Sequence, residues 1–277
     1  MTRARRSFVL LFLSGLMLSG AVPAAQAEEA VQMTFLGNMG FRFTSPDGHV
    51  ILTDPWLEGN PDAPFGVGDI ERADLILVSG AHPDNVGDAA AIAKQTGATV
   101  IATSELGAWL MGQGVPRGQL HSMMPGGLYE RDGVSVKVVH AVHTAGVWSA
   151  GQATPGYGGM SIGFVITFEN GLRVYFSGDT GLFGDMRLFG SLYRPDVAIL
   201  SAAGRYMMEP EDGALAARLL RTDNPELTTV IPAHHRLEGT RPEEAPTARR
   251  LQREVDRLQI PVTVLTPAPG EPQALEK

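Results

Sequence analysis

Short apolar runs separated by turn residues fill the early part of the chain. Residues 31–37, 41–44 and 50–53 are each rich in aliphatic and aromatic side chains, and an Asp47-Gly48 pair stands between the last two runs. An Asp-Gly pair between two apolar runs is a strong hairpin signal. The pattern therefore predicts a β-meander.

Further along, apolar runs are followed by segments with helical periodicity. After a glycine- and proline-rich loop at 54–68, strands are expected at residues 74–78 and 99–102 and helices at 86–96 and 105–113. The pattern then predicts strands at residues 134–142, 161–168, 172–176, 196–200, 228–232 and 262–265 and helices at 210–220 and 242–258. Two β-rich blocks, each followed by helices, indicate an α/β fold in which two sheets lie face to face and helices cover them.

Two other segments lack a clear period. Residues 145–159 are rich in glycine and include Trp148 and Tyr157. Such a segment is typical either of a flap over a site or of a plain connector. Residues 267–277 are expected to form a short tail of low complexity.

The first 27 residues have the pattern of a cleavable export signal. Arg3, Arg5 and Arg6 precede an apolar core at residues 8–22, and Ala25-Gln26-Ala27 supplies small residues for cleavage. The paired arginines are also typical of a twin-arginine signal, and a retained anchor is the alternative. The sequence thus predicts a signal peptide at residues 1–27, a single domain at 28–277, and a periplasmic or secreted protein with no stable membrane insertion after cleavage.

Charge and cysteine content narrow the classes of function. The signal contains three of the 22 basic residues and no acidic one, so the mature chain carries 19 basic and 30 acidic residues and a net charge of −11. Nonspecific nucleic-acid binding relies on basic surface, so this balance argues against it. The chain has no cysteine, and any metal must therefore be held by histidine and carboxylate.

Metal-capable side chains follow four of the expected strands. They are His82 and Asp84, His140 and His143, Asp179, and His234 and His235. Loops at one edge of layered sheets converge, so ligands far apart in sequence can meet there. The joint placement favours one site over several isolated structural histidines.

Five runs carry a family resemblance: Thr-Phe-Leu-Gly at 34–37, Ile-Leu-Thr-Asp-Pro-Trp at 51–56, residues 73–78, Ser-Gly-Asp-Thr-Gly-Leu-Phe-Gly-Asp at 177–185 and Val-Ile-Pro-Ala-His at 230–234. With them the chain resembles the metallo-β-lactamase superfamily, and within it the ascorbate-6-phosphate-lactonase-like metal-dependent hydrolases. The resemblance implies an αββα sandwich with a metal site at one edge.

The first ligand loop departs from that family's His-x-His-x-Asp-His motif. Gly80 stands at the first histidine position and Asn85 at the last, while His82 and Asp84 match the motif. Asn38 stands where a histidine often follows the opening Leu-Gly. The remaining ligand positions map onto His143, Asp179 and His234.

The resemblance implies two metal pockets, each short of one imidazole. The first would keep His82, His143 and Asp179, and the second would keep Asp84, Asp179 and His234, with Asn85 a weak oxygen donor at best. Two imidazoles and one carboxylate suit zinc or ferrous iron, whereas the oxygen-rich second set suits manganese or magnesium. We expect one firmly held divalent metal at most, with zinc first and manganese or iron as alternatives.

The other four histidines are expected either to replace a lost ligand or to lie away from the site. His140 or His235 could replace a lost ligand, whereas His49 and His121 are expected in turns or on the surface.

The expected activity is hydrolysis of a lactone, ester or phosphoester of a small molecule by a metal-activated water. Asp84 or Asp179 would orient that water and accept its proton. Arg205 and Tyr206 could bind an anionic substrate group, or could simply lie on the surface at the start of a helix. A non-catalytic periplasmic binding or accessory protein is the alternative function, and a mononuclear iron oxidoreductase is a third.

Overall fold

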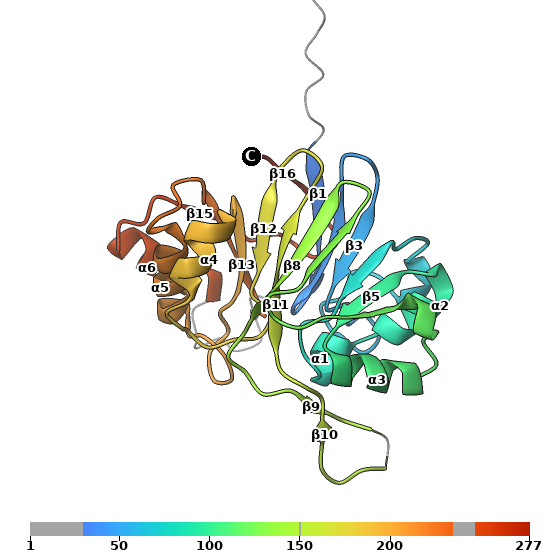
Figure 1. Cartoon of the computed structure of the whole chain (residues 1–277). Helices are drawn as coiled ribbons and strands as arrows, with labels where there is room; N and C mark the ends of the chain where they lie inside the picture. Colours follow the sequence, from blue (N-terminus) through green and yellow to red (C-terminus); the bar gives the residue numbers. More distant parts are fainter. Residues whose placement is uncertain (1–29, 150, 235–246) are drawn as a thin grey trace, which may run out of the picture.

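The computed structural model describes residues 30–149, 151–234 and 247–277 of the chain (Figure 1). Within these residues two seven-stranded sheets lie face to face, and helices cover the outer face of each. The predicted αββα sandwich is confirmed. The predicted signal at residues 1–27 lies outside the described residues. No helix in the described part is both long and apolar enough to cross a bilayer.

The first sheet is antiparallel in one half and parallel in the other. Its strands, in spatial order, are β16 (Pro272–Leu275), β1 (Val31–Gly37), β2 (Gly40–Thr44), β3 (Val50–Thr53), β4 (Leu75–Leu77), β5 (Thr99–Ala102) and β6 (Leu120–Ser122). The pairs from β16 to β3 are antiparallel and those from β3 to β6 are parallel. The predicted meander is confirmed, and Gly48 takes a φ of 83° in its turn.

The second sheet repeats this arrangement. Its order is β15 (Thr263–Val264), β14 (Thr229–Ala233), β13 (Val197–Ser201), β12 (Arg173–Phe176), β11 (Ile162–Thr167), β8 (Val134–His140) and β7 (Leu128–Arg131). The strands from β7 to β12 pair antiparallel and those from β12 to β15 pair parallel. As a result β8, β12 and β14 all run in the same direction and release their loops at one edge.

The helices form two separate layers. The first sheet carries α1 (Pro83–Val86), α2 (Ala89–Thr96) and α3 (Ser104–Gly112), and the second carries α4 (Met186–Tyr193), α5 (Pro210–Arg221) and α6 (Thr247–Arg257). Single 3-10 turns lie at Val67–Asp69 and Arg117–Gln119. Apolar residues of each helix pack on the sheet below it, as their periodicity predicts.

Aromatic side chains fill the space between the sheets. Phe35, Phe41 and Phe43 of the first sheet and Phe164 and Phe176 of the second are fully buried. The rings of Phe41 and Phe176 meet edge to face across the layers, with centroids 6.3 Å apart. Replacing such a buried phenylalanine with alanine typically costs about 3–5 kcal/mol. This core fixes the two sheets, and therefore the edge at which their loops meet.

The helix predicted at residues 86–96 is wrong in its start and in its continuity. The chain forms α1 from Pro83, breaks at Gly87, and resumes as α2. Gly87 has a φ of 46°, and a Cβ there would lie 2.4 Å from the carbonyl oxygen of Pro55. The loop after β3 therefore docks into the break. Asp88 fixes it by accepting hydrogen bonds from the backbone N–H groups of Leu57 and Glu58.

Other differences concern elements that depend on tertiary pairing. The expected tail at 267–277 contains β16, which pairs with β1 at the edge of the first sheet. Helix α4 and strands β6 and β7 were not expected. Segment 145–159 carries two short paired strands, β9 (Gly146–Val147) and β10 (Gly156–Tyr157), and projects from the sandwich near α1 (Figure 1).

Candidate metal centre

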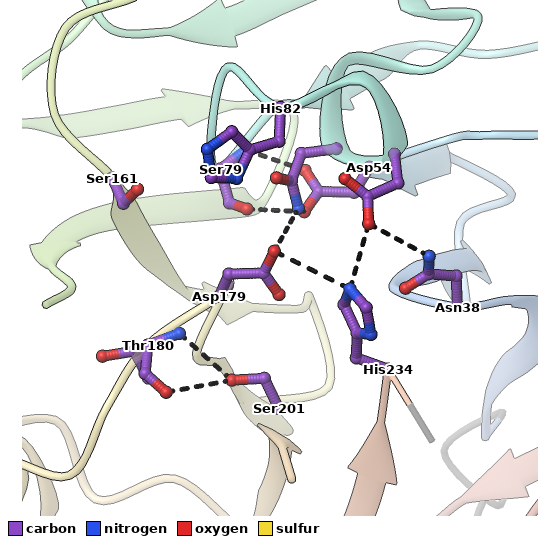
Figure 2. A network of polar contacts seen from close by, with 12 residues as sticks. Asn38, Asp54, Ser79, His82, Ser161, Asp179, Thr180, Ser201 and His234 are labelled. Carbon is purple, nitrogen blue, oxygen red and sulfur yellow. Dashed lines mark hydrogen bonds and ion pairs between the residues drawn. The ribbon is translucent and has the colours of Figure 1, made fainter. Parts of the chain in front are cut away.

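The loops after four strands bring the five predicted ligands together. Among the described residues, two groups each place one ligand atom per side chain within 4.8 Å of the others. One group is His82, His143 and Asp179, and the other is Asp84, Asp179 and His234. Asp179 belongs to both, and Figure 2 shows it between His82 and His234. The geometry thus reproduces the two triads expected from the sequence.

Hydrogen bonds join the loop that carries Asp179 to the loop that carries His143. The backbone N–H of Val142 donates to Thr180 Oγ1 at 2.9 Å, and the N–H of Gly181 donates to the Val142 carbonyl oxygen at 3.0 Å. The N–H of Thr180 also donates to Ser201 Oγ at 3.1 Å (Figure 2). Asp179 is only 4 % exposed, so its carboxylate has a fixed and nearly dry position.

The first group contains two imidazoles in contact. The rings of His82 and His143 have centroids 5.1 Å apart and planes at 87°. His82 immediately precedes α1, whose first residue, Pro83, is suited to a helix start. Burial lowers the pKa of His143, with a smaller contribution from the neighbouring His82 and against the opposing charge of Asp179. A low pKa keeps the imidazole neutral, the form that binds a metal.

The second group contains an ion pair. His234 Nε2 lies 3.0 Å from Asp84 Oδ2, and Asn38 Nδ2 donates to the same oxygen at 3.2 Å. Burial is the largest single effect and opposes the charge on both partners, but their mutual hydrogen bond and the attraction between opposite charges in the site together outweigh it. The pKa of Asp84 is therefore lowered and that of His234 raised. His234 also has a φ of 54°, in the left-handed region, and its N–H donates to the Asn38 carbonyl oxygen at 2.8 Å.

The hydrogen bonding of the Asp179 carboxylate shows whether these residues fit a cation. Its Oδ1 is buried and has no hydrogen-bond partner among the described residues. Its Oδ2 accepts a hydrogen bond from Asn85 and lies 4.0 Å from His234 Nε2. A buried carboxylate oxygen without a donor is costly. A divalent cation would satisfy it, so the donor set fits a metal, and histidine with aspartate leaves the identity of that metal open.

Asn85 contributes to the site as a hydrogen-bond donor, through its side-chain nitrogen. Its Nδ2 donates to Asp54 Oδ2 at 3.1 Å and to Asp179 Oδ2 at 3.2 Å, while its Oδ1 is buried without a partner among the described residues. Only an amide nitrogen can satisfy two carboxylate acceptors, which fixes the orientation of the side chain. Asn85 therefore ties two buried acids together at the position where the family motif has a ligand histidine.

Gly80 lies directly beside that amide. A Cβ at residue 80 would be 3.0 Å from Asn85 Oδ1 and 3.7 Å from Ser161 Oγ. The first distance is tighter than nine in ten real Cβ contacts, so the Asn85 side chain occupies the space into which a residue-80 side chain would extend. The two departures from the family motif are thus neighbours in space.

Asp54 is a site residue that the sequence analysis did not single out. It is fully buried and accepts hydrogen bonds from the backbone N–H of Ser79 at 2.7 Å, from Ser79 Oγ at 2.5 Å and from Asn85. Burial raises its pKa well above the ordinary value, although the hydrogen bonds of Ser79 oppose the shift. Its place in the Asp-Pro-Trp turn, directly after an apolar strand, was the available signal.

The raised pKa of Asp54 predicts a pH dependence. At pH values above the ordinary carboxyl pKa of 3.8, Asp54 keeps its proton in the folded protein and loses it on unfolding. The free energy of unfolding therefore falls as the pH rises above that value. An asparagine at this position cannot titrate. We therefore expect the stability advantage of the wild type over Asp54→Asn to shrink as the pH rises above the ordinary carboxyl value of 3.8. Urea unfolding of both metal-free proteins measures it, and an advantage that grows with pH would show that the donors keep Asp54 charged.

The remaining histidines of the described residues lie outside both groups. His140 Nε2 lies 3.6 Å from an oxygen of Asp185, and its ring packs on Phe183. His235 lies outside the described residues. His49 is 3.7 Å from Glu169 and His121 packs on Tyr129. The proposed substitution of a ligand by His140 therefore has no support in this geometry.

A cavity of about 540 Å³ opens over both triads. Its lining includes all five ligands together with Trp148, from the β9–β10 hairpin, and Tyr206. Trp148 is 49 % exposed and Tyr206 65 % exposed, so both stand at the rim. A cavity of this size accommodates a small organic molecule.

Comparison with known proteins agrees with this geometry. The family model of the beta-lactamase superfamily domain matches residues 49–235. The chain is 38 % identical to a UPF0173 metal-dependent hydrolase of Rubrobacter xylanophilus over 87 % of its own length and 95 % of the relative's. It is 37 % identical to one of Solibacter usitatus over 87 % and 99 % of the two lengths.

A solved structure shares the same architecture. A metallo hydrolase of the archaeon Ignicoccus hospitalis superposes with a TM-score of 0.73 at 29 % identity, over 90 % of this chain and 99 % of that one. The matches span nearly the whole folded part and include every strand end that carries a candidate ligand. The protein therefore belongs to the metallo-β-lactamase superfamily, and within it to the UPF0173 metal-dependent hydrolases.

Proposed function

We propose that the protein is an exported hydrolase that uses one metal-bound water to cleave a lactone, ester or phosphoester of a small molecule. The observation that carries the proposal is the position of Asp179, a nearly buried carboxylate shared by two ligand triads beneath an open cavity. The family relationship supports metal-dependent hydrolysis. The type of bond that is cleaved and the cellular location go beyond that relationship and are our proposal.

The donor set supports a single metal in the triad of His82, His143 and Asp179. Both imidazoles are in contact, and the lowered pKa of His143 favours its neutral form. The other triad is already satisfied by the ion pair between Asp84 and His234. A bound divalent metal would lower the pKa of a water to about 7.

The chain's own residues supply the proton acceptor and the orientation. Asp84 lines the cavity and has a lowered pKa, so it is ionised at neutral pH, the form in which a carboxylate can accept a proton. Its ion pair with His234 and the hydrogen bond from Asn38 fix the direction of the carboxylate. Asp179 Oδ2 is held by Asn85 and its Oδ1 remains available as a ligand atom.

Metal analysis combined with turnover tests the proposal. Mature protein from its native compartment should contain about one equivalent of transition metal and hydrolyse at least one member of a lactone, ester and phosphodiester panel. A chelator should abolish that activity, and the metal should restore it. His121→Ala is the matched control for His82→Ala, because His121 lies outside both triads.

Two outcomes would contradict hydrolysis at this centre. Activity that survives chelation or His82→Ala would place the chemistry elsewhere. Stoichiometric metal without turnover across the panel, combined with thermal stabilisation by a ligand, would favour the binding or accessory protein.

Export is proposed from the sequence of residues 1–27. We expect the mature chain to begin at Glu28, and intact-mass measurement of the protein from the periplasm or the medium checks this. Replacing Arg5 and Arg6 with lysine should block export by a twin-arginine route and leave general secretion intact. A full-length chain retained in the membrane fraction would instead show an uncleaved anchor.

A further inference from the structure

A second cavity, of about 250 Å³, adjoins the metal centre on the side of His234. It shares Tyr206, Met207 and His234 with the larger cavity. A molecule whose reacting bond lies over the triads can therefore extend past Tyr206 into this second space. The chemistry of its walls then limits which substrates fit.

Arg205 is the cationic group of the second cavity. It follows Gly204 in a tight turn, with a φ of 56°, and its backbone N–H donates to Glu209 Oε1 at 3.3 Å. Its guanidinium carbon lies 4.8 Å from the centroid of the Tyr206 ring. Left-handed backbone at a non-glycine residue is uncommon and costs free energy. The turn therefore gives the side chain a defined starting direction beside the cavity.

The guanidinium lacks a carboxylate partner in the described residues. Arg72, Arg187 and Arg194, by contrast, each pair with an acid within 3.0 Å. In a mature chain of net charge −11, an arginine without an acidic partner at a cavity wall supplies local attraction for an anion that the overall field would repel. Arginine also binds carboxylate and phosphate through two parallel hydrogen bonds.

The other residues that line the second cavity are of mixed polarity. Trp56 offers an apolar face, Asn38 places an amide at the junction with Asp84, and Asp62 is the acidic member of the lining. Asp62 forms no ion pair with Arg205 in the described structure. An acid there disfavours a ligand with charge spread over its whole length, and favours one with a localised anion at Arg205 and a hydroxyl or amine donor facing Asp62.

Resting on the proposed hydrolase function, we infer that the second cavity binds an anionic group of the substrate through Arg205. The substrate class is then a small ester, lactone or phosphoester that carries a further carboxylate or phosphate away from the cleaved bond. Tyr206 lines both cavities, and its ring lies beside the guanidinium.

Matched substrate pairs test the inference. Each pair has the same scissile bond, with a neutral end in one member and a carboxylate or a phosphate in the other. Arg205→Gln should raise KM for the anionic members about 10- to 100-fold, the loss typical of a charge-assisted contact. It should leave the neutral members within about twofold, and Arg205→Lys should recover part of the loss. Arg187→Gln, which breaks a surface pair with Asp223, is the control.

A binding measurement keeps the inference testable if no substrate turns over. Inorganic phosphate and succinate are titrated by calorimetry into metal-free wild type and Arg205→Gln. Binding by the wild type that the variant loses supports the anion site, and the preferred probe identifies carboxylate or phosphate. Equal binding by both proteins, or an equal effect of the variant on neutral and anionic substrates, overturns it. Failure of hydrolysis alone contradicts only the proposed function.

Discussion

Asp179→Ala is expected to remove the bound metal and to reduce hydrolysis by more than about 100-fold, the upper end for residues that merely support metal ligands. Asp179 is the one side chain that both triads share. Its removal leaves two imidazoles in the first triad and one histidine with one carboxylate in the second. Neither set of remaining side chains supplies the three protein ligands typical of a catalytic zinc site.

Stability measurements separate loss of metal from loss of fold. A ligand present at about 1,000 times its Kd stabilises a folded protein by about 4.1 kcal/mol. The wild type should therefore lose thermal stability when a chelator is added, whereas Asp179→Ala should be insensitive to the chelator and close to the metal-free wild type. Asp185→Ala is the matched control, because Asp185 is exposed and lies beside His140 outside both triads.

Single-histidine variants then locate the metal. His82 belongs only to the first triad and His234 only to the second. A metal in the first triad predicts that His82→Ala loses it and that His234→Ala retains most of it. The reverse result would move the metal to the oxygen-rich triad. Retention of a full equivalent by Asp179→Ala would contradict this description of the centre.

The placement of the ligands could be predicted from the sequence because it depends on patterns that tertiary structure preserves. Apolar runs that end in histidine or aspartate become strands whose loops meet at one edge, and β8, β12 and β14 do run in the same direction. The core between the sheets follows from the same runs. The pattern alone offers seven candidate side chains, His140 and His235 among them, and the family resemblance selects the five that converge.

The roles of the supporting residues could not be predicted, because they arise from contacts between distant segments. Asn85 acts through its nitrogen only because Asp54 and Asp179 approach it from two different sheets. The helix break at Gly87 depends on the approach of Pro55, and β16 becomes a strand because the edge of β1 is free to pair. None of these contacts leaves a periodic signal in the chain.

Replacing Gly80 and Asn85 together with histidine is expected to raise the metal content from about one equivalent to two. Each triad lacks one imidazole relative to the family motif, and residues 80 and 85 stand at the missing positions. The Cβ direction of Gly80 leads to the Asn85 amide, which itself contacts Asp179. Exchanging Asn85 at the same time removes the amide oxygen that a Cβ at residue 80 would meet.

The single substitutions should behave differently from the pair. Gly80→His alone forces its Cβ to within 3.0 Å of Asn85 Oδ1, and overpacking of this kind typically costs about 1–3 kcal/mol. It also displaces the amide from Asp54 and Asp179. The double variant should recover stability in the presence of metal, since each new imidazole faces a ligand set instead of an amide. Elemental analysis and chelator-dependent unfolding of the four proteins measure both effects. Two equivalents in the wild type, or one in the double variant, would show that Gly80 and Asn85 do not set the metal count.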